Sequence, residues 1–260
     1  MPYGNRQAIE KRLKRSINRF AAASSGMLIA GCIATYFGAG AGPALSMLAV
    51  TAPVIAVFDF TARYKADLFR RPDGEKVDTF ETANILTAVR IFLVPPVMVL
   101  LEYGYILEGG ILFVVAALTD VADGMAARGL GQETRFGLMV DPVGDIISNI
   151  ALFTWLWVSG GFPVWLFVLL CIRYGQFFAG LGVLTLVGRR PKLHATIAGK
   201  SAGVVQTAGI VALLAARLRP DIVSDDMRVS VIYPALAAAF VVVIISQTVI
   251  GLRAAAGEQG

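Results

Sequence analysis

The chain has 260 residues, of which 57% are hydrophobic and 16% are charged, and its mean hydropathy is +0.70. Because soluble domains carry about 25% charged residues, this composition excludes an ordinary soluble domain and predicts an integral membrane protein. The long apolar runs do not alternate as the strands of a barrel do, so helices are expected to span the bilayer. The net charge of +5 is explained by loops that face anionic lipid headgroups, and no nucleic-acid partner is expected.

The first element is a basic segment that ends near residue 19. Its apolar residues Ile9, Leu13 and Ile17 recur every four positions, which predicts an amphipathic helix leading into an uncleaved span. We expect about eight spanning helices, at residues 20–38, 43–60, 84–102, 108–129, 137–159, 162–187, 199–217 and 229–252. The predicted fold class is therefore an all-α integral membrane protein.

The basic residues of the loops predict how these spans are oriented. Lysine and arginine concentrate in residues 6–19, 63–76 and 189–192. With eight spans, all three regions lie on one side of the membrane, which the positive-inside rule assigns to the cytoplasm. Both termini are then cytoplasmic, and we expect the membrane to be the bacterial inner membrane. The link at residues 217–228 is an exception, because it carries arginines on the opposite side.

The junction between the fourth and fifth spans carries four aspartates within apolar sequence. Asp120 and Asp123 are three residues apart and Asp141 and Asp145 are four apart, so each pair shares one face of a helix. If the two helices are antiparallel neighbours, the pairs converge near the cytoplasmic boundary. An ionised carboxylate costs roughly 2.5–3.5 kcal/mol at the centre of a spanning helix and less near its ends. Four together therefore need compensating positive charge.

Divalent metal is the compensation that these residue types favour. Arg128 alone supplies too little positive charge, and carboxylate oxygens are the ligands that Mg²⁺ and Mn²⁺ prefer. Four carboxylates can hold two ions at the separation used in two-metal phosphoryl chemistry. The alternative is that each aspartate is a solvated cap in an ordinary polar turn, which explains one such residue more easily than four at paired spacing.

Eight positions of this stretch resemble the signature of the CDP-alcohol phosphotransferase family. They are Asp120, Asp123, Gly124, Ala127, Arg128, Gly137, Asp141 and Asp145. The resemblance implies a six-helix membrane domain over residues 80–260. It leaves residues 1–79, a basic segment with two extra helices and a cytoplasmic linker, without a counterpart. It also implies transfer of a substituted phosphate from a CDP-linked lipid, usually CDP-diacylglycerol, to an acceptor alcohol with release of CMP. A homodimer surrounded by membrane lipids is expected.

The same resemblance implies roles for individual residues. The metal ligands, for Mg²⁺ or Mn²⁺, would be Asp120, Asp123, Asp141 and Asp145, and Asp145 would also be the catalytic base. The CDP-donor site would comprise Asn84, Thr87, Gly124, Ala127, Arg128, Thr134 and Gly137. Asn84, Thr87 and Arg90 are spaced by three and are expected to present one polar face to the nucleotide. The alternative is a helix start with a snorkelling arginine.

The segment "ETRFGLMVDPVGD" resembles the phosphatidylglycerophosphate synthase branch of the family, although Gly144 replaces the usual alanine and Ile146 replaces the usual lysine. Arg173 and Lys200 match the same branch and are our candidates for binding an anionic acceptor such as glycerol 3-phosphate. Arg173 lies deep in an apolar run, where a charge is expensive and usually functional. Lys200 is equally well explained as an anchor at the membrane boundary.

Other functions stay open at this point. Inositol phosphate, serine or another alcohol is an alternative acceptor for the same chemistry. A cation-coupled transporter is a different class, but transporters often show internal repeats, and no repeat is visible in this sequence. An inactive scaffold is a third class, and it would more plausibly have lost one of the aspartates.

Overall fold

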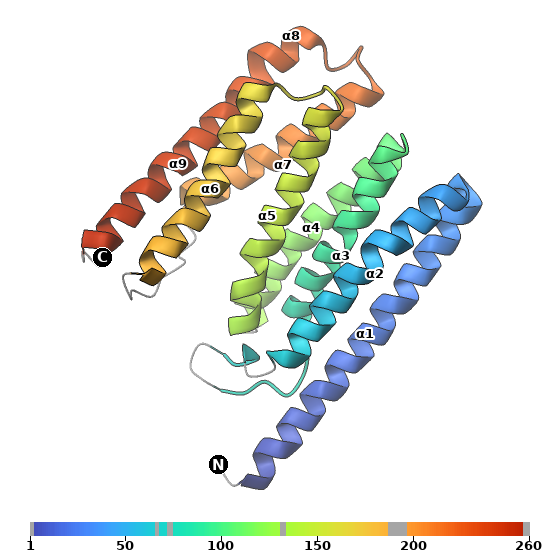
Figure 1. The fold of residues 1–260 in the computed structure, drawn as a ribbon, viewed down its shortest axis with the longest axis vertical. Coiled ribbons are helices and arrows are strands. Elements are labelled where there is room, and N and C mark those ends of the chain that lie inside the picture. The colour runs from blue at the N-terminus through green and yellow to red at the C-terminus, as the bar shows by residue number, and fades with distance from the viewer. Residues whose placement is uncertain (1–2, 66–67, 72–74, 131–133, 187–196, 257–260) are drawn as a thin grey trace. The chain divides into compact units, whose positions relative to one another are not determined.

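A computed structural model of the chain describes residues 3–65, 68–71, 75–130, 134–186 and 197–256. Within these ranges, the side chains are described except those of residues 3–7, 83, 120–130, 181, 184–186, 197–198 and 253–256. The described part of the chain is almost entirely helical, as Figure 1 shows. The predicted all-α class is therefore confirmed.

Two long helices come first. Helices α1 (Tyr3–Ala39) and α2 (Ala41–Tyr64) pack against each other and are separated only by Gly40, whose φ of 90° suits glycine. The sequence predicts a basic helix followed by a span, whereas the structure joins both in one continuous helix. A bilayer core of about 30 Å needs about 20 helical residues. The basic N-terminal part of α1 therefore extends beyond the hydrocarbon layer.

The remaining helices follow in the predicted order. They are α3 (Thr82–Glu102), α4 (Ile106–Leu130), α5 (Arg135–Val158), α6 (Val164–Leu186), α7 (Ile197–Leu218), the short α8 (Asp225–Met227), the π-helix η2 (Arg228–Ile232) and α9 (Tyr233–Ala256). Glycines at positive φ form the tight turns after α3 and α5, with φ of 84° at Gly104 and 75° at Gly160. At the start of α8, the Ser224 hydroxyl accepts a hydrogen bond from the Met227 amide at 3.2 Å.

Several of these helices can cross a membrane. Six segments of the described chain are long and apolar enough: Ala8–Ala39, Ala41–Tyr64, Asn84–Glu102, Arg135–Val158, Gly199–Leu218 and Asp225–Leu252. The shorter apolar helices Ile106–Thr119 and Val164–Gly180 correspond to the other two predicted spans. Large apolar side chains lie exposed on the helices, as for Phe37, which is 82% exposed. Lipid accounts for such exposure, and the chain is an integral membrane protein.

The chain divides into two compact units, Met1–Asn149 and Ile150–Gly260. In the first unit, α1 packs on α2, α2 on α3, and α3 on α4. In the second unit, α9 packs on both α6 and α7. The predicted metal ligands and donor-site residues all belong to the first unit, and Arg173 and Lys200 belong to the second. The domain boundary expected at residue 80 stays a prediction.

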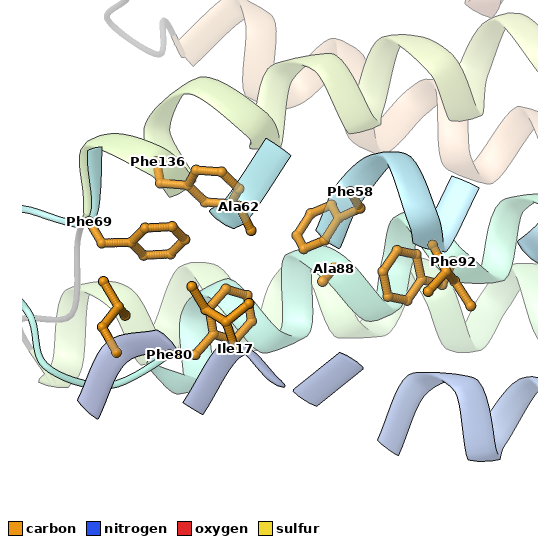
Figure 2. Packing of buried hydrophobic residues seen from close by; sticks show 10 residues of the cluster. Ile17, Phe58, Ala62, Phe69, Phe80, Ala88, Phe92 and Phe136 are labelled. Carbon is orange, nitrogen blue, oxygen red and sulfur yellow. The ribbon is translucent and has the colours of Figure 1, made fainter. Parts of the chain in front are cut away.

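The core of the first unit is built from phenylalanine rings, which we call the aromatic cluster (Figure 2). Its members are Phe20 of α1, Phe58 of α2, Phe69 and Phe80 of the linker between α2 and α3, Phe92 of α3 and Phe136 of α5. Ring centroids lie between 4.4 Å and 6.5 Å apart, in the range of favourable edge-to-face and offset contacts. The two N-terminal helices therefore share one core with α3 and α5.

Candidate active site

One face of α3 carries a row of buried polar residues. Asn84, Thr87 and Arg90 are spaced by three and are only 2%, 3% and 4% exposed. Helical geometry places residues at this spacing on the same side, one turn above another. Each of the three contacts a residue of α5 or of the position just before it, as the next paragraphs describe. The polar face predicted for α3 is thus present and faces α5.

Arg90 lies between the two aspartates of α5. Its Nη1 atom is 3.1 Å from Oδ1 of Asp145, and its Nη2 atom is 3.7 Å from Oδ1 of Asp141. The arginine side chain is 5% exposed, whereas the aspartate side chains are 40% and 54% exposed. A snorkelling arginine would keep its guanidinium in water, so that interpretation of Arg90 is wrong. Arg90 instead supplies positive charge to both carboxylates.

Thr87 fixes the first of these aspartates. Its hydroxyl donates to Oδ1 of Asp141 over 2.6 Å, the short distance typical of a hydroxyl bonded to a carboxylate. The same Oδ1 atom faces Arg90, so one oxygen of Asp141 is engaged from α3 by two groups. Both groups engage Oδ1, and the Asp141 side chain is still 40% exposed, so part of the carboxylate stays accessible to a ligand.

A second set of hydrogen bonds lies one turn earlier. The Thr134 hydroxyl donates to Oδ1 of Asn84 over 2.9 Å and accepts a bond from the Gly137 amide at 3.1 Å. Both Asn84 and Thr134 are 2% exposed. The Nδ2 group of Asn84 is buried and donates to no group in the described part of the chain. A buried donor left in this way is costly unless a ligand or water uses it.

Two glycines of α5 allow the close approach to α3. A Cβ atom on Gly137 would lie 3.1 Å from Oδ1 of Asn84 and 3.4 Å from Oγ1 of Thr134. A Cβ atom on Gly144 would lie 3.0 Å from Cγ1 of Ile91. Both distances are tighter than ordinary contacts, so a larger residue at either position would push the helices apart.

The described carboxylates suit a hard divalent cation. Asp141 and Asp145 stand one helical turn apart and keep a large accessible fraction of their side chains, so further oxygen lone pairs remain for a ligand. No third Asp, Glu, His or Cys joins them among the side chains that the structure describes. Asp120 and Asp123, the other two predicted ligands, lie outside that set. The oxygen-only donor set fits Mg²⁺ or Mn²⁺ and offers nothing that zinc prefers.

Part of the predicted site lies outside the described side chains. These residues are on α4, namely Asp120, Asp123, Gly124, Ala127 and Arg128. Helix α4 packs against α3, the helix that carries Arg90. The convergence of all four aspartates stays a prediction.

The two predicted acceptor residues lie in the second unit. The Arg173 guanidinium lies 5.1 Å from the ring centre of Tyr174 and 5.8 Å from that of Phe240 on α9. Aromatic faces stabilise a cation in apolar surroundings. Lys200 is exposed near the start of α7. The acceptor role of both residues stays a prediction.

Sequence reasoning missed the role of Arg90 as a counter-ion. It assigned the α3 face to the nucleotide, found Arg128 alone too little positive charge, and named divalent metal as the compensation. The available signal was the position of Arg90 within an apolar run, at helical spacing from two other polar residues. Spacing along one helix does not say which helix lies opposite, so the partners could not be named.

The fold and the site define a class: a multi-pass helical membrane protein with an acidic pair held in the N-terminal half of a spanning helix. Comparison with known families agrees, because a model of the CDP-alcohol phosphatidyltransferase family matches residues 80–250. The chain belongs to this family. The match begins at the end of the linker, and it leaves α1 and α2 outside.

Several curated relatives are similar to the chain. The "Probable phosphatidylglycerophosphate synthase" of Mycobacterium tuberculosis is 35% identical over 139 residues, which cover 49% of this chain and 63% of the relative. The "CDP-diacylglycerol--glycerol-3-phosphate 3-phosphatidyltransferase" of Bacillus subtilis is 30% identical over 161 residues, covering 56% of this chain and 82% of the relative. A protein of the same name from Pectobacterium atrosepticum is 29% identical over 169 residues, covering 62% and 90%. The chain thus spans less than two thirds of the length of the mycobacterial relative.

Proposed function

We propose that this protein transfers a phosphatidyl group from CDP-diacylglycerol to glycerol 3-phosphate, releasing CMP and forming phosphatidylglycerophosphate. The observation that carries the proposal is the pairing of Asp141 and Asp145 with Arg90 on a buried polar face of α3. Two carboxylates held beside a buried cation in a membrane protein of this family are suited to metal-assisted phosphoryl transfer. The printed names of the relatives support the choice of donor and acceptor.

The donor would bind where α3 meets the start of α5. Among the described residues, the buried Nδ2 group of Asn84 there has no acceptor, while its Oδ1 accepts from the Thr134 hydroxyl, which in turn accepts from the Gly137 amide. A carbonyl or phosphate oxygen of the nucleotide is the partner that this donor needs. Gly124, Ala127 and Arg128 of α4 are proposed to complete the donor site.

The chemistry divides between a metal and the protein. Bound Mg²⁺ or Mn²⁺, held by Asp141, Asp145, Asp120 and Asp123, would neutralise the diphosphate and stabilise the CMP leaving group. Asp145 accepts the proton of the acceptor hydroxyl. The hydroxyl oxygen then bonds to the phosphorus of the phosphatidyl group as the bond from that phosphorus to CMP breaks. The side chain of Asp145 is more exposed than that of Asp141, which is also hydrogen-bonded to Thr87. Asp145 is therefore the more accessible carboxylate for the acceptor hydroxyl, and it is our choice for the base.

The acceptor would be anionic. Arg173 and Lys200 are proposed to bind its phosphate, which a guanidinium and an ammonium group suit. Basic residues at the N-terminus and in the linker support an orientation with both termini and the site facing the cytoplasm. A homodimer in the bacterial inner membrane is part of the same proposal.

The decisive experiment measures CMP release. Purified protein in lipid nanodiscs receives Mn²⁺ or Mg²⁺, CDP-diacylglycerol and, separately, glycerol 3-phosphate, inositol phosphate or serine. We expect CMP only with metal, and fastest with glycerol 3-phosphate. Faster release with another acceptor would keep the chemistry and replace the substrate. No release with any acceptor would count against the enzyme itself.

Two variants separate the proposed roles. Asp145→Asn should abolish turnover, because the amide cannot take the proton, and should lower the thermal unfolding midpoint only in part, because Asp141 still faces the buried Arg90. Arg173→Ala should raise the KM of the acceptor far more than the KM of the donor. A larger effect on the donor would move Arg173 to the nucleotide site.

A further inference from the structure

The first turn of α5 has two faces with different partners. Thr134 and Gly137 belong to the polar set that holds Asn84 of α3. Phe136, which lies between them in sequence, is 1% exposed and points into the aromatic cluster. The residues that would position the nucleotide and the contacts of the cluster therefore share one helical turn. A displacement of Phe136 must displace its neighbours as well.

The linker holds this turn directly. The ring of Phe69 stacks on that of Phe136, with centroids 4.4 Å apart and planes 21° from parallel (Figure 2). The amide of Arg135 donates to the carbonyl oxygen of Arg70 over 2.9 Å. The first amides of a helix have no partner within the helix, so this bond satisfies a group that would otherwise be orphaned. One side chain and one backbone bond thus fasten the start of α5 to the linker.

Backbone hydrogen bonds join two stretches of the linker, residues 68–71 and 75–77. The amide of Val77 donates to the carbonyl oxygen of Phe69 over 3.1 Å, and the amide of Arg71 donates to that of Glu75 over 2.9 Å. A short antiparallel bridge between Arg70 and Lys76 accompanies these bonds. Phe69 therefore lies in a stretch of backbone that is paired with a second stretch of the linker.

Helix α1 holds the linker from the other side. The hydroxyl of Ser16 accepts a hydrogen bond from the Phe80 amide over 3.0 Å, and the ring of Phe20 lies 4.8 Å from that of Phe80. The buried residues Leu13 and Ile17 on the same face of α1 belong to the same core. This is the basic helix that the family match leaves out. A continuous path of contacts runs from α1 through the linker to the first turn of α5.

We propose that α1 and the linker are a positioning element for the nucleotide end of the active site, with Ser16 and Phe69 as its positioning residues. The expected effect on donor binding rests on the proposed function. The expected effect on the structure of the first turn of α5 rests only on contacts within the first unit. The contacts given above for Ser16 and Phe69 are with Phe80 and Phe136, which are not predicted ligand residues. Ser16 and Phe69 act through Phe80 and Phe136, and so they set the geometry of Thr134, Gly137 and Asn84.

The first test removes the stacked ring from the full chain in nanodiscs. Hydrogen exchange of the peptide covering residues 134–141 is measured together with both KM values. We expect Phe69→Ala to speed this exchange about tenfold or more, because the local opening that exposes the amides becomes easier. The donor KM should rise about tenfold while the acceptor KM changes by less than about twofold, since small misplacements of binding groups carry large penalties.

Phe162→Ala is the matched control. Phe162 is also a buried phenylalanine, 4% exposed, but it follows the opposite end of α5 and contacts Phe153 and Tyr233. This variant should lower the thermal unfolding midpoint and leave both the exchange at 134–141 and the donor KM near wild type. Equal effects of the two variants on exchange and on KM would overturn the proposal.

A milder second test uses serines of α1. Ser16→Ala leaves the Phe80 amide without its acceptor and should give the same donor-specific effect at a few-fold size, while Ser16→Thr restores it. Ser24→Ala is the control, because the Ser24 hydroxyl donates to the Phe20 carbonyl oxygen of its own helix and so makes a bond within α1. Unchanged exchange in Ser16→Ala would reject the role of α1. Hydrogen exchange needs no turnover, so a wild-type protein that releases no CMP would reject the proposed function alone.

Discussion

The guanidinium of Arg90 and the carboxylate of Asp145 form an ion pair at 3.1 Å in which the cation is buried and the anion is half exposed. This asymmetry suits a ligand site. The buried partner cannot leave without a large cost, and so it keeps the carboxylate in place. The exposed Asp145 carboxylate keeps oxygen lone pairs that can bind a metal or accept a proton from the substrate. A pair with both members buried would be stable but closed to ligands.

Replacing Arg90 should therefore affect stability and metal response together. We expect Arg90→Gln to lower the free energy of unfolding by about 1–3 kcal/mol, below the usual loss for a fully buried pair because both aspartates are partly solvated. Mn²⁺ should then raise the thermal unfolding midpoint by more than in the wild type, since two uncompensated carboxylates gain more from a divalent ion. Arg71→Gln, which removes a pair with Glu75 and Glu81 in the linker, is the control. An equal Mn²⁺ response in both variants would contradict the role of Arg90.

The hydroxyl of Thr134 should contribute to the free energy of unfolding through two hydrogen bonds. Thr134→Val keeps the shape but leaves the Gly137 amide and Oδ1 of Asn84 without their partner, which costs about 1–3 kcal/mol. Thr134→Ser keeps both bonds and should stay close to wild type. The donor KM should rise in the valine variant only. Thermal unfolding and steady-state kinetics of the three proteins measure this.

Thr51 provides a matched comparison. It is also buried, at 2% exposure, but its hydroxyl has no hydrogen-bond partner in the described part of the chain. Thr51→Val should therefore be neutral or stabilising, because it removes a polar group that folding leaves unsatisfied. If both valine variants lost the same stability, the hydrogen bonds of Thr134 would not be the cause.

Gly144 and Ile91 should prove to be a compensating pair. A Cβ atom on Gly144 would lie 3.0 Å from Cγ1 and 3.3 Å from Cδ1 of Ile91. Gly144→Ala should destabilise by about 1–3 kcal/mol through overpacking. Adding Ile91→Ala should recover part of that loss, giving a favourable coupling of at least about 0.5 kcal/mol. Additive losses in the double variant would show that the crowding is not between these two residues.

The fold was largely predictable because apolar runs of spanning length have few alternatives in lipid. The span expected at residues 84–102 appears as α3, Thr82–Glu102. The continuity of α1 was not predicted, because a basic segment and an apolar run look like separate elements although nothing breaks the helix between them. The aromatic cluster was also beyond local reasoning. Its rings come from five segments, and only tertiary packing brings Phe69 to Phe136.

The site was predictable in its residue types and not in its pairings. Helical spacing correctly put Asn84, Thr87 and Arg90 on one face and Asp141 beside Asp145. Which face meets which helix depends on contacts between distant parts of the chain, so the link from Arg90 to the aspartates emerged only from the structure. The glycine at position 144 could not be explained from the sequence either, because the residue that a Cβ atom would crowd, Ile91, belongs to another helix.

A last prediction concerns the arginines at residues 217–228, which the positive-inside rule does not explain. Arg217 at the end of α7 donates to the carbonyl oxygen and, at 2.9 Å, to the hydroxyl of Ser159 in the α5–α6 turn. Its guanidinium also lies 5.9 Å from the ring centre of Trp155. The side chain of Arg219 bonds to the nearby Asp221, at 3.1 Å and 2.9 Å. Among the described residues, the first arginine therefore links distant segments of the second unit, whereas the side chain of the second bonds within its own turn.

Arg217→Gln should lower the free energy of unfolding by about 0.5–1.5 kcal/mol, with turnover unchanged, because a charged donor to the turn is lost at a partly exposed site. Arg219→Gln should leave the thermal unfolding midpoint unchanged, since a pair within one exposed turn constrains nothing else. Both variants remove one positive charge from the same link, so an effect on topology would be common to them. A difference between the two midpoints assigns Arg217 to tertiary structure, whereas matching midpoints would mean that its bonds to Ser159 stabilise nothing.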